Sequence, residues 1–384
     1  MPTPLALSLA NTIRQEIRTG SLREGRALPP ERDLAKAYNV SRGVVRQAVD
    51  SLAREGWLVR QPNCRPVVAR GRFTIDRTKA DHINVWLWPS TSDFVASSVF
   101  RGIQDGLKGS PYRLVVGTAR TDGGWAAAIH DEVDFLCQVS DDPTCAGALL
   151  WPIGEEEMME PLQKAQAARL PLVFVDREPP LGWAGDVVCT DNYGSAREVA
   201  IELYRRGHRK LAILSNRDTA SSVRERISGF LAGLKECGGS GEPSILTFSP
   251  LEGETDADAY RRTLARLPRE DGPTAVFCIN DSLALGALEA LEQLGFSVPG
   301  DLSVAGFDGL LRWIPGGGRL ASAHQDFRRI GELAIQLLLR RIAEDGDPDL
   351  PRRHLLLPAP FVARESVGAP NADRLAGHRA GREP

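Results

Sequence analysis

The segment LPPERDLAKAYNVSRGVVRQAVDSLAREGWL, residues 28–58, carries the clearest structural signal in this chain of 384 residues. Two prolines followed by acidic residues are typical of a helix start, so a short helix is predicted over 31–38. Residues 39–40 predict a tight turn. Ser41 is a favourable N-cap residue, and apolar residues after it recur at helical spacing, which predicts another helix over 41–55. The segment therefore predicts a helix-turn-helix.

The residues on either side extend this unit. Upstream, apolar residues recur every four positions over 5–19, which predicts an additional helix. Downstream, short apolar runs at 57–59 and 66–68 predict the two strands of a hairpin. Three helices followed by a hairpin make a winged helix-turn-helix.

The arginines of this unit fall where a DNA-reading helix needs them. Ser41, Arg42 and Gly43 lie in the first turn of the third helix, and Arg46 lies one turn later on the same face. A recognition helix enters the major groove with its N-terminal residues on the base edges, where an arginine can donate two hydrogen bonds to guanine. Arg32 begins the preceding helix and is placed for a phosphate or base contact. Double-stranded DNA is the expected partner; the alternative is that these arginines only solvate a helix face.

The distribution of charge agrees with a DNA-binding head. The chain has a formal net charge of −3, but residues 1–72 carry a net charge of +7 and the remainder carries −10. A basic segment on an acidic body favours a polyanion as partner. No apolar run reaches the length of a membrane span, and the N-terminus lacks the pattern of a secretory signal, so no membrane partner and a cytoplasmic location are expected.

Residues 5–69 resemble the DNA-binding domain of the GntR family of bacterial transcription factors. The resemblance rests on residues 28–35, 40–48 and 52–58. By that resemblance, the DNA-contact positions are Arg32, Ser41, Arg42, Gly43 and Arg46. The wing turn departs from the Gly-rich turn of the family. Asn63 in this turn can take the left-handed conformation that a glycine would, and Arg65 is placed to contact the DNA backbone or minor groove.

A different pattern begins at residue 82, where short apolar strands alternate with helices. Strands are predicted over 83–88, 112–117, 146–151, 172–176, 210–215, 244–248, 275–279 and 303–306. Helices are predicted over 99–107, 158–168, 193–206, 224–237, 256–267 and 283–294. Such alternation is typical of parallel sheets covered on both faces, and two runs of strands predict an α/β body of two doubly wound lobes.

Ligands of such sheets bind at the carboxyl ends of the strands. The polar and aromatic residues near those ends are Phe94, Asp176, Arg226, Asn280 and Asp308, with Phe277 inside a strand. Carboxylates, an amide and an arginine suit the adjacent hydroxyls of a sugar or polyol, and aromatic rings stack on its apolar face. For Asp281 the alternative is a simple helix N-cap.

Residues 82–366 resemble the LacI/GalR effector domain, which has a periplasmic-binding-protein-like fold. The resemblance rests on residues 188–194, 206–212, 226–230, 275–286, 298–308, 325–331 and 363–366. It implies that the ligand cleft is lined by Phe94, Asp176, Arg226, Phe277, Asn280 and Asp308. Gly309 departs from the family, which commonly has a second acid there, and the loop over 88–92 is irregular.

These resemblances imply a domain order and a function. A winged helix over 1–69, a linker over 70–81, a ligand-binding and dimerisation domain over 82–366 and a disordered tail over 367–384 are expected. A GntR-type head on a LacI-type body resembles the AraR-type repressors. The expectation is a homodimeric, ligand-responsive transcriptional regulator, acting as a repressor, whose lobes close on a small effector, most simply a sugar or related polyol.

Two alternatives belong to other functional classes. A cytoplasmic sugar-binding protein would have no need of the basic head. A GntR-fused enzyme, such as a pyridoxal-phosphate enzyme, would need a Schiff-base lysine, and no lysine here follows a cofactor-type motif. The six cysteines include no Cys-x-x-Cys pair and are interpreted as small buried hydrophobes. No catalytic residue, cofactor or metal site is therefore expected.

Overall fold

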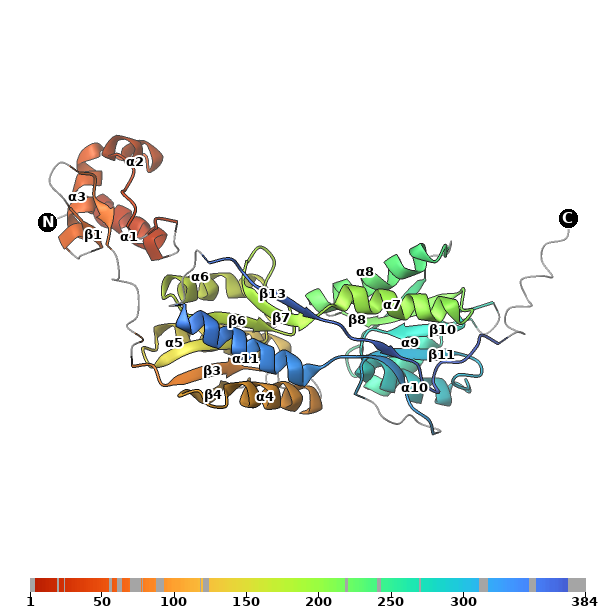
Figure 1. Cartoon of the computed structure of the whole chain (residues 1–384). Helices are drawn as coiled ribbons and strands as arrows, with labels where there is room; N and C mark the ends of the chain where they lie inside the picture. Colours follow the sequence, from red (N-terminus) through yellow and green to blue (C-terminus); the bar gives the residue numbers. More distant parts are fainter. Residues whose placement is uncertain are drawn as a thin grey trace.

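The computed structural model contains a small helical head and two α/β lobes (Figure 1). The structure describes residues 4–18, 21–23, 25–54, 57–60, 64–69, 77, 79–87, 93–117, 119, 124–217, 220–239, 243–268, 271–310, 317–344 and 350–371. Most of the predicted linker, the wing residue Asn63, the loop over 88–92 and the tail from 372 lie outside these residues. No helix within them is long and apolar enough to cross a membrane.

The head is the winged helix-turn-helix that the sequence predicts. Its helices are α1 (Pro4–Arg18), α2 (Glu31–Ala37) and α3 (Arg42–Arg54). Its wing is the antiparallel pair β1 (Leu58–Val59) and β2 (Val67–Val68). Ile13, Val45 and Leu52 are fully buried at the centre of the head, because the apolar faces of α1 and α3 pack against each other.

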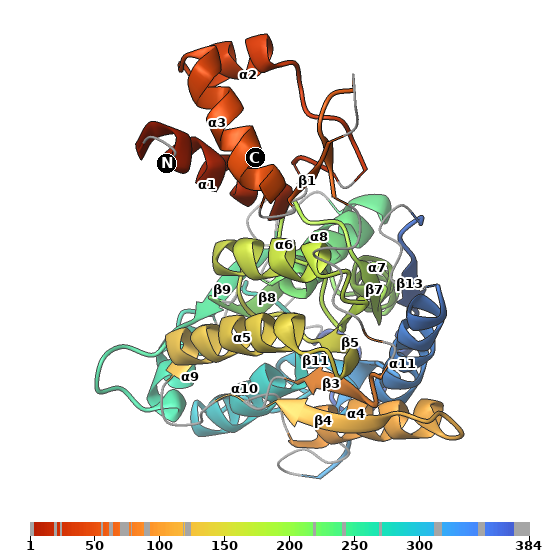
Figure 2. The same ribbon diagram turned by 90° about the vertical axis from the view of Figure 1, so that its left-hand side faces the viewer.

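The first lobe, here called the N-lobe, is built on a six-stranded parallel sheet in the order β13-β7-β6-β5-β3-β4. Its elements up to the first crossing are β3 (His82–Trp86), α4 (Asp93–Leu107), β4 (Arg113–Gly117), α5 (Gly124–Asp141), β5 (Cys145–Leu150), a 3-10 turn (Glu156–Met158), α6 (Met159–Ala167), β6 (Leu172–Val175) and β7 (Asp186–Thr190). Figure 2 shows α5 and α6 on one side of the sheet and α4 and α11 on the other.

The second lobe, the C-lobe, has a sheet in the order β14-β12-β11-β10-β8-β9, in which only β14 is antiparallel to its neighbour. Its elements are α7 (Asn192–Arg205), β8 (Leu211–Asn216), α8 (Ser221–Glu236), β9 (Ser244–Phe248), α9 (Asp256–Leu264), β10 (Ala275–Cys278), α10 (Asp281–Gln293), β11 (Ser303–Asp308), β12 (Ala321–His324) and β14 (Phe361–Val362). Helices α7 and α8 pack together, as do α9 and α10.

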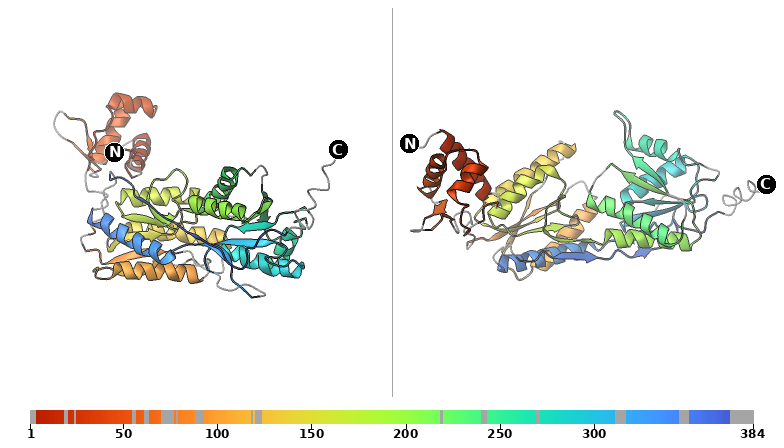
Figure 3. Two further views of the ribbon diagram at one scale, coloured as in Figure 1. Left: turned by 45° about the vertical axis from the view of Figure 1, so that its right-hand side comes forward. Right: turned by 90° about the horizontal axis from the view of Figure 1, so that it is seen from above.

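Within the residues that the structure describes, the chain passes between the lobes three times. It leaves the N-lobe after β7, returns after β12 to form α11 (Phe327–Ala343) and β13 (His354–Leu357), and leaves again after β13 (Figures 1 and 3). Cys189, His324 and Leu357 lie in or at the ends of the strands that precede these crossings. Because the crossing segments are few and short, the two lobes are joined by a narrow junction.

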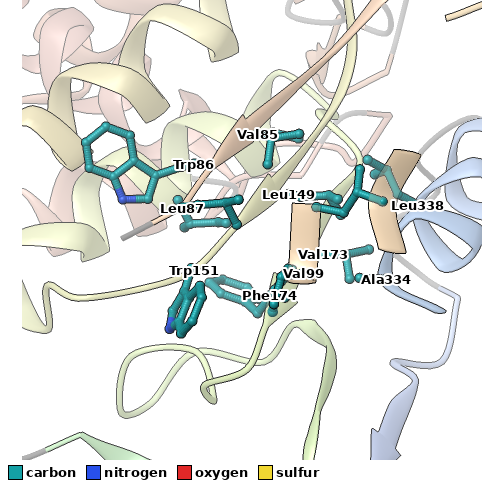
Figure 4. Close-up of a cluster of buried hydrophobic side chains, with 14 of the residues drawn as sticks. Val85, Trp86, Leu87, Val99, Leu149, Trp151, Val173, Phe174, Ala334 and Leu338 are labelled. Carbon is teal, nitrogen blue, oxygen red and sulfur yellow. The ribbon is translucent and has the colours of Figure 1, made fainter. Parts of the chain in front are cut away.

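The N-lobe core shows why its helices lie where they do (Figure 4). Val85, Leu149 and Val173 on neighbouring strands are fully buried, and Leu338 of α11 covers them. Helices α4 and α11 approach closely because Gly331 has no side chain: a Cβ there would lie 2.0 Å from the carbonyl oxygen of Val99. Burial of this apolar surface is the main stabilising contribution to the lobe.

Some elements differ from those predicted. The sequence patterns did not predict α5, α11 or the strands β7, β12, β13 and β14, and helices α4 and α8 begin earlier than predicted. The predicted disordered tail was too long. Val367 is buried in the C-lobe core, and the carbonyl oxygen of Gly368 lies 3.1 Å from Nε2 of His208. A short apolar segment at a chain end gives no periodicity by which its docking could be predicted.

Candidate functional site

The first turn of α3 presents polar groups on the surface of the head. Ser41 Oγ accepts a hydrogen bond from the Val44 amide at 3.3 Å, which is N-cap geometry. Ser41, Arg42 and Gly43 are exposed. The start of α3 therefore combines exposed arginine with the free amides of a helix N-terminus, an arrangement that can bind phosphate or base edges.

Arg46 is exposed and held by an acid from the neighbouring helix. Its Nε and Nη2 donate to the carboxylate of Glu31 on α2, at 3.3 and 2.9 Å. This pair lowers the pKa of Glu31, and the arginine side chain stays 61% exposed. The contact fixes Arg46 beside the first turn of α3.

The two remaining predicted DNA-contact residues are also exposed. Arg32 is 83% exposed and lies beside Asp33. Arg65, at the base of the wing, donates to the carbonyl oxygen of Leu28 at 3.4 Å. Every predicted DNA-contact side chain is thus available on the head surface.

A second polar site lies where the C-lobe meets the crossings. Arg226 of α8 is only 8% exposed and donates to Asn192 Oδ1 and to the carbonyl oxygen of Ile279, both at 2.8 Å. Its Nη1 also lies 3.3 Å from Asp308 Oδ1, and its guanidinium stacks 3.9 Å above the ring of Phe307. The site therefore contains a buried guanidinium group whose position is fixed by hydrogen bonds.

Asp308 connects this cation to the opposite lobe. The residue ends β11 with a positive φ of 125°, and its Oδ1 accepts a bond from Gln325 Nε2 at 2.7 Å. Gln325 lies on the second crossing, and its Oε1 accepts a bond from Thr190 of β7 at 2.5 Å. Burial raises the pKa of Asp308, an effect that Arg226 opposes. A continuous chain of polar contacts thus runs from Thr190 in the N-lobe to Arg226 in the C-lobe.

The carboxyl edge of the N-lobe sheet carries polar atoms that lack protein partners. Within the part of the chain that the structure describes, Trp86 Nε1, Trp151 Nε1 and Asp176 Oδ1 are buried without a hydrogen bond. The three residues end or follow β3, β5 and β6. Burial raises the pKa of Asp176, whereas Arg226 and Arg177 lower it. Because an unpaired buried polar group is costly, two donors and one acceptor at one edge are suited to a polar ligand.

A cavity of 170 Å³ opens between the lobes. Its N-lobe wall includes Ile153 and Arg177, and its C-lobe wall is formed by Ala220 and Ser221 at the start of α8. The Glu178 amide donates to Ser221 Oγ at 3.1 Å and so joins the two walls. On the N-lobe side, the lining residue Arg177 directly follows Asp176 in the sequence. On the C-lobe side, the lining residue Ser221 begins α8, the helix that carries Arg226.

A buried carboxyl group supports one wall of this cavity. Glu132 of α5 is fully buried and accepts bonds from the amides of Ile153, at 3.2 Å, and Gly154, at 2.8 Å. Burial raises the pKa of Glu132 to about 8, despite the backbone hydrogen bonds that lower it. Glu132 therefore fixes the loop after β5 in place.

The structure separates the predicted effector residues into two groups. Arg226 Nη1 lies 3.3 Å from Asp308 Oδ1, and Asp176 lies near enough for the charge of Arg226 to oppose the rise that burial causes in its pKa, so these three residues come together. Asn280 lies next to Ile279, but its Oδ1 caps α10 by accepting the Leu283 amide at 2.7 Å. These residues are at the site, with Asn280 partly engaged in helix capping.

The two predicted aromatic residues are not brought to the same place. Phe277 is fully buried inside the C-lobe core and stacks on Phe230, with ring centroids 4.6 Å apart. Phe277 is therefore a core residue in this structure, because a strand residue that points under the covering helices does not reach the carboxyl edge. Phe94, in the first turn of α4, is 57% exposed.

Asp281 is neither the helix cap nor a solvent-facing ligand residue. It is 1% exposed and accepts bonds from Ser322 Oγ at 2.7 Å and from the Leu310 amide at 2.6 Å. Its role is to hold the end of β11 near β12. The N-cap residue of α10 is instead Asn280, one residue earlier in the chain.

Sequence reasoning missed several groups at the site: Trp86, Glu132, Trp151, Thr190, Asn192 and Gln325. Three of them lie inside motifs that carry the LacI/GalR resemblance, which was a usable signal. Glu132 gave none, because a glutamate in a helix is ordinarily solvated. Its structural role depends on a hydrogen bond from the amide of Ile153, which lies 21 residues away in the sequence.

Comparison with known proteins agrees with this architecture. Residues 5–68 match the model of the bacterial regulatory proteins of the gntR family, and residues 200–367 match the model of the periplasmic binding protein-like domain. The resemblances that the sequence indicated, and the α/β fold class, are confirmed.

Three similar proteins illustrate the match. An arabinose metabolism transcriptional repressor from Geobacillus stearothermophilus is 24% identical over 347 residues, which cover 89% of this chain and 92% of that protein. The HTH-type transcriptional repressor PurR from Mannheimia succiniciproducens is 33% identical over 198 residues, 52% of this chain and 57% of that protein. The structure of a transcriptional regulator CelR-cellobiose complex superposes with a TM-score of 0.62 at 20% identity, covering 88% of this chain and 100% of that one.

Proposed function

We propose that this chain, in which a GntR-type winged helix is joined to a periplasmic-binding-protein-like body, is a ligand-responsive bacterial DNA-binding transcriptional regulator. The observation that carries the proposal is the presence in one chain of an arginine-bearing α3 and of a buried polar network across two lobes. The named relatives are repressors, which supports repression as the direction of control.

We assign DNA binding to residues 1–69 and effector binding and dimerisation to residues 82–366, joined by a linker over 70–81. In the head, Arg42 and Arg46 would read base edges in the major groove, while Arg32, Ser41, Gly43 and Arg65 would contact the backbone or adjacent bases. The exposed positions of these residues support that assignment.

The effector is a small polyhydroxylated molecule, most simply a sugar. Asp176 and Asp308 would accept from its hydroxyl groups, whereas Arg226 and the two indole N–H groups would donate to it. The buried unpaired atoms at the carboxyl edge of the N-lobe support this donor and acceptor pattern. So do a relative named for arabinose metabolism and a structural neighbour bound to cellobiose.

Binding would be transmitted through the junction between the lobes. A ligand held by Asp176 from one side and by Arg226 from the other favours one angle between the lobes, and the Thr190–Gln325–Asp308 contacts lie where that angle changes. The ligand shifts operator affinity only by its differential affinity for the two arrangements, typically about 1–3 kcal/mol.

The functional unit is a homodimer acting on DNA in the cytoplasm. The outer edge strands of both sheets expose apolar side chains: Val115 and Val116 on β4, and Ile245 on β9. Edge strands of this kind are usually covered, and a second copy of the chain would cover them. A twofold dimer would present two α3 helices to half-sites about one DNA turn, or a multiple of it, apart.

The proposal involves no reaction: each assigned residue only donates or accepts hydrogen bonds or contacts the DNA. It is tested with the full chain by selecting duplexes from fragmented bacterial DNA at low ionic strength. The recovered duplex is then used in binding titrations with and without sugars, polyols and purines, and a melting-temperature shift identifies the effector. Failure to retain any duplex, with or without these compounds, would overturn the proposal.

A further inference from the structure

Three side chains with metal-ligand chemistry meet at the junction between the lobes. Glu178 follows β6, Cys189 lies in β7, and His354 begins β13. The Cys189 Sγ atom lies 3.7 Å from Glu178 Oε1 and 3.7 Å from His354 Nε2, and the latter two atoms are 2.6 Å apart. Among the residues that the structure describes, these three form the one such group whose ligand atoms all lie close together.

The separations are those of a tetrahedral site that needs little adjustment. A zinc ion bonded to sulfur at about 2.3 Å and to nitrogen and oxygen at about 2.0–2.2 Å places its ligand atoms roughly 3.3–3.6 Å apart. The two sulfur distances already approach this value. Only the distance between Glu178 Oε1 and His354 Nε2 must increase, by about 0.7 Å, so that each atom bonds to the ion instead of to the other. The His354 side chain is 50% exposed and can make that movement.

The donor set and its surroundings select one class of ion. A thiolate, an imidazole and a carboxylate together suit zinc and neighbouring divalent transition metals rather than calcium or magnesium, which prefer oxygen alone. His354 is half exposed and gives the ion a path from solvent, while Cys189 is buried. Burial raises the pKa of Glu225 of α8, and the nearby charge of Glu178 raises it further, whereas Asn192 and His354 oppose the shift.

We propose that Glu178, Cys189 and His354 bind a divalent transition-metal ion of the zinc class, with water or Glu225 completing the coordination. Two of the ligands lie on strands that lead into crossings: Cys189 of β7 is three residues before the start of α7, and His354 begins β13, the strand that leads to the last crossing. The Glu178 amide is bonded to Ser221 of α8. A bound ion would therefore fasten three segments on which the relative movement of the lobes depends.

Binding must displace protons, and this gives a signature that is independent of any regulatory activity. The thiol of Cys189 is protonated without metal, because burial and the nearby acids raise its pKa. A thiolate bonded to the ion loses that proton, so binding releases acid to the solvent.

The experiment uses the full chain without a histidine tag, freed of metal by a chelator. Cobalt(II) should bind one ion per chain and produce a thiolate-to-cobalt charge-transfer band, and zinc should displace it with release of protons into weakly buffered solution. Cys189→Ser should abolish the band. His354→Gln should weaken zinc binding by roughly 100-fold or more, since even loss of an outer partner of a ligand costs about 10–100-fold.

The matched controls are Cys137→Ser and His130→Gln, which remove the same residue types from α5 outside the cluster. Both controls should keep the band and the affinity. Because His354 is half exposed, its replacement is tolerated by the fold, and its result stands even where Cys189→Ser folds poorly. A wild-type chain without the charge-transfer band, or equal zinc affinity in wild type and His354→Gln, would overturn the proposal.

Discussion

Arg46 on α3 and Glu31 on α2 are joined by two hydrogen bonds through Nε and Nη2 of the arginine. The residues lie 15 positions apart in sequence, so the helix-turn-helix itself brings them together. The pair orients a side chain that would otherwise sample many rotamers, and orientation before binding reduces the entropic cost of a DNA contact. Glu31 also adds a negative charge next to the proposed DNA surface, so Arg46 must share its donors between Glu31 and DNA.

Replacement of the α3 arginines should weaken operator binding. Arg42→Ala and Arg46→Ala should each cost about 5–150-fold per half-site, the equivalent of about 1–3 kcal/mol for a bidentate base contact. The measurement is a binding titration on the selected duplex at fixed salt. Glu31→Gln should have a smaller effect than Arg46→Ala, because it loosens the arginine without removing it.

Arg54→Ala is the matched control for these variants. Arg54 is exposed in the last turn of α3, away from the helix N-terminus, and its Nε donates to the carbonyl oxygen of Asp50 at 3.4 Å. It should bind the operator like wild type, and all the variants should keep the effector-induced melting shift. If Arg42→Ala and Arg46→Ala also bind like wild type, α3 is not the reading helix.

Operator affinity should fall steeply with salt. Each arginine that contacts a phosphate releases condensed counterions, and about 6–10 such contacts cost about 10³–10⁵ in affinity between 50 and 200 mM salt. The measurement is the slope of log affinity against log salt concentration. Arg32→Ala should reduce that slope if it contacts a phosphate, whereas a slope near zero for wild type would contradict a phosphate-dominated interface.

The head could be predicted closely because its signals are local. Prolines, acids and the Ser41 N-cap mark helix ends within a few residues, and the apolar spacing defines the buried face. The strands that alternate with helices predicted the two lobes for the same reason. By contrast, the charged network depends on Thr190, Asp308 and Gln325, which are brought together only by the crossings. No local pattern distinguishes Glu132 as buried or Phe277 as hidden from the cleft.

The metal-ligand group is a further example of this limit. The absence of Cys-x-x-Cys spacing favoured buried structural cysteines, yet Cys189 and His354 meet although they are 165 residues apart. Parallel strands β7 and β13 are neighbours in the sheet, and that adjacency was not predictable because β13 was not predicted. Spacing rules detect ligands on one segment and are uninformative for ligands assembled by topology.

Removal of either charge of the buried Arg226–Asp308 pair should uncouple effector binding from DNA binding. Arg226→Gln and Asp308→Asn should lose effector binding by at least about tenfold, because each removes a charged hydrogen-bonding partner worth roughly 1.5–3 kcal/mol. Operator binding without effector should persist, since the head is unchanged. The measurement is operator affinity with and without effector, together with calorimetry of effector binding.

Arg224→Gln is the control on the same helix. Arg224 is exposed two residues from Arg226, so its loss should leave effector affinity unchanged. Melting curves without effector separate a folding defect from a binding defect. A fully responsive Arg226→Gln/Asp308→Asn double variant would place the effector elsewhere.

Glu132 should make the stability of the N-lobe dependent on pH. Its pKa is raised from 4.5 to about 8 by burial, so over this range the unfolded chain is ionised while the folded chain holds the proton. The unfolded state then binds fewer protons, and the free energy of unfolding contributed by this group falls as pH rises from about 5 to about 8. Glu132→Gln cannot ionise and can still accept a hydrogen bond from the Gly154 amide, so its melting temperature should change less over that range.

Asp134→Asn, an exposed change on the same helix, should follow the wild-type profile. Parallel pH profiles for wild type and Glu132→Gln would show that the Glu132 carboxyl is ionised in the folded protein throughout.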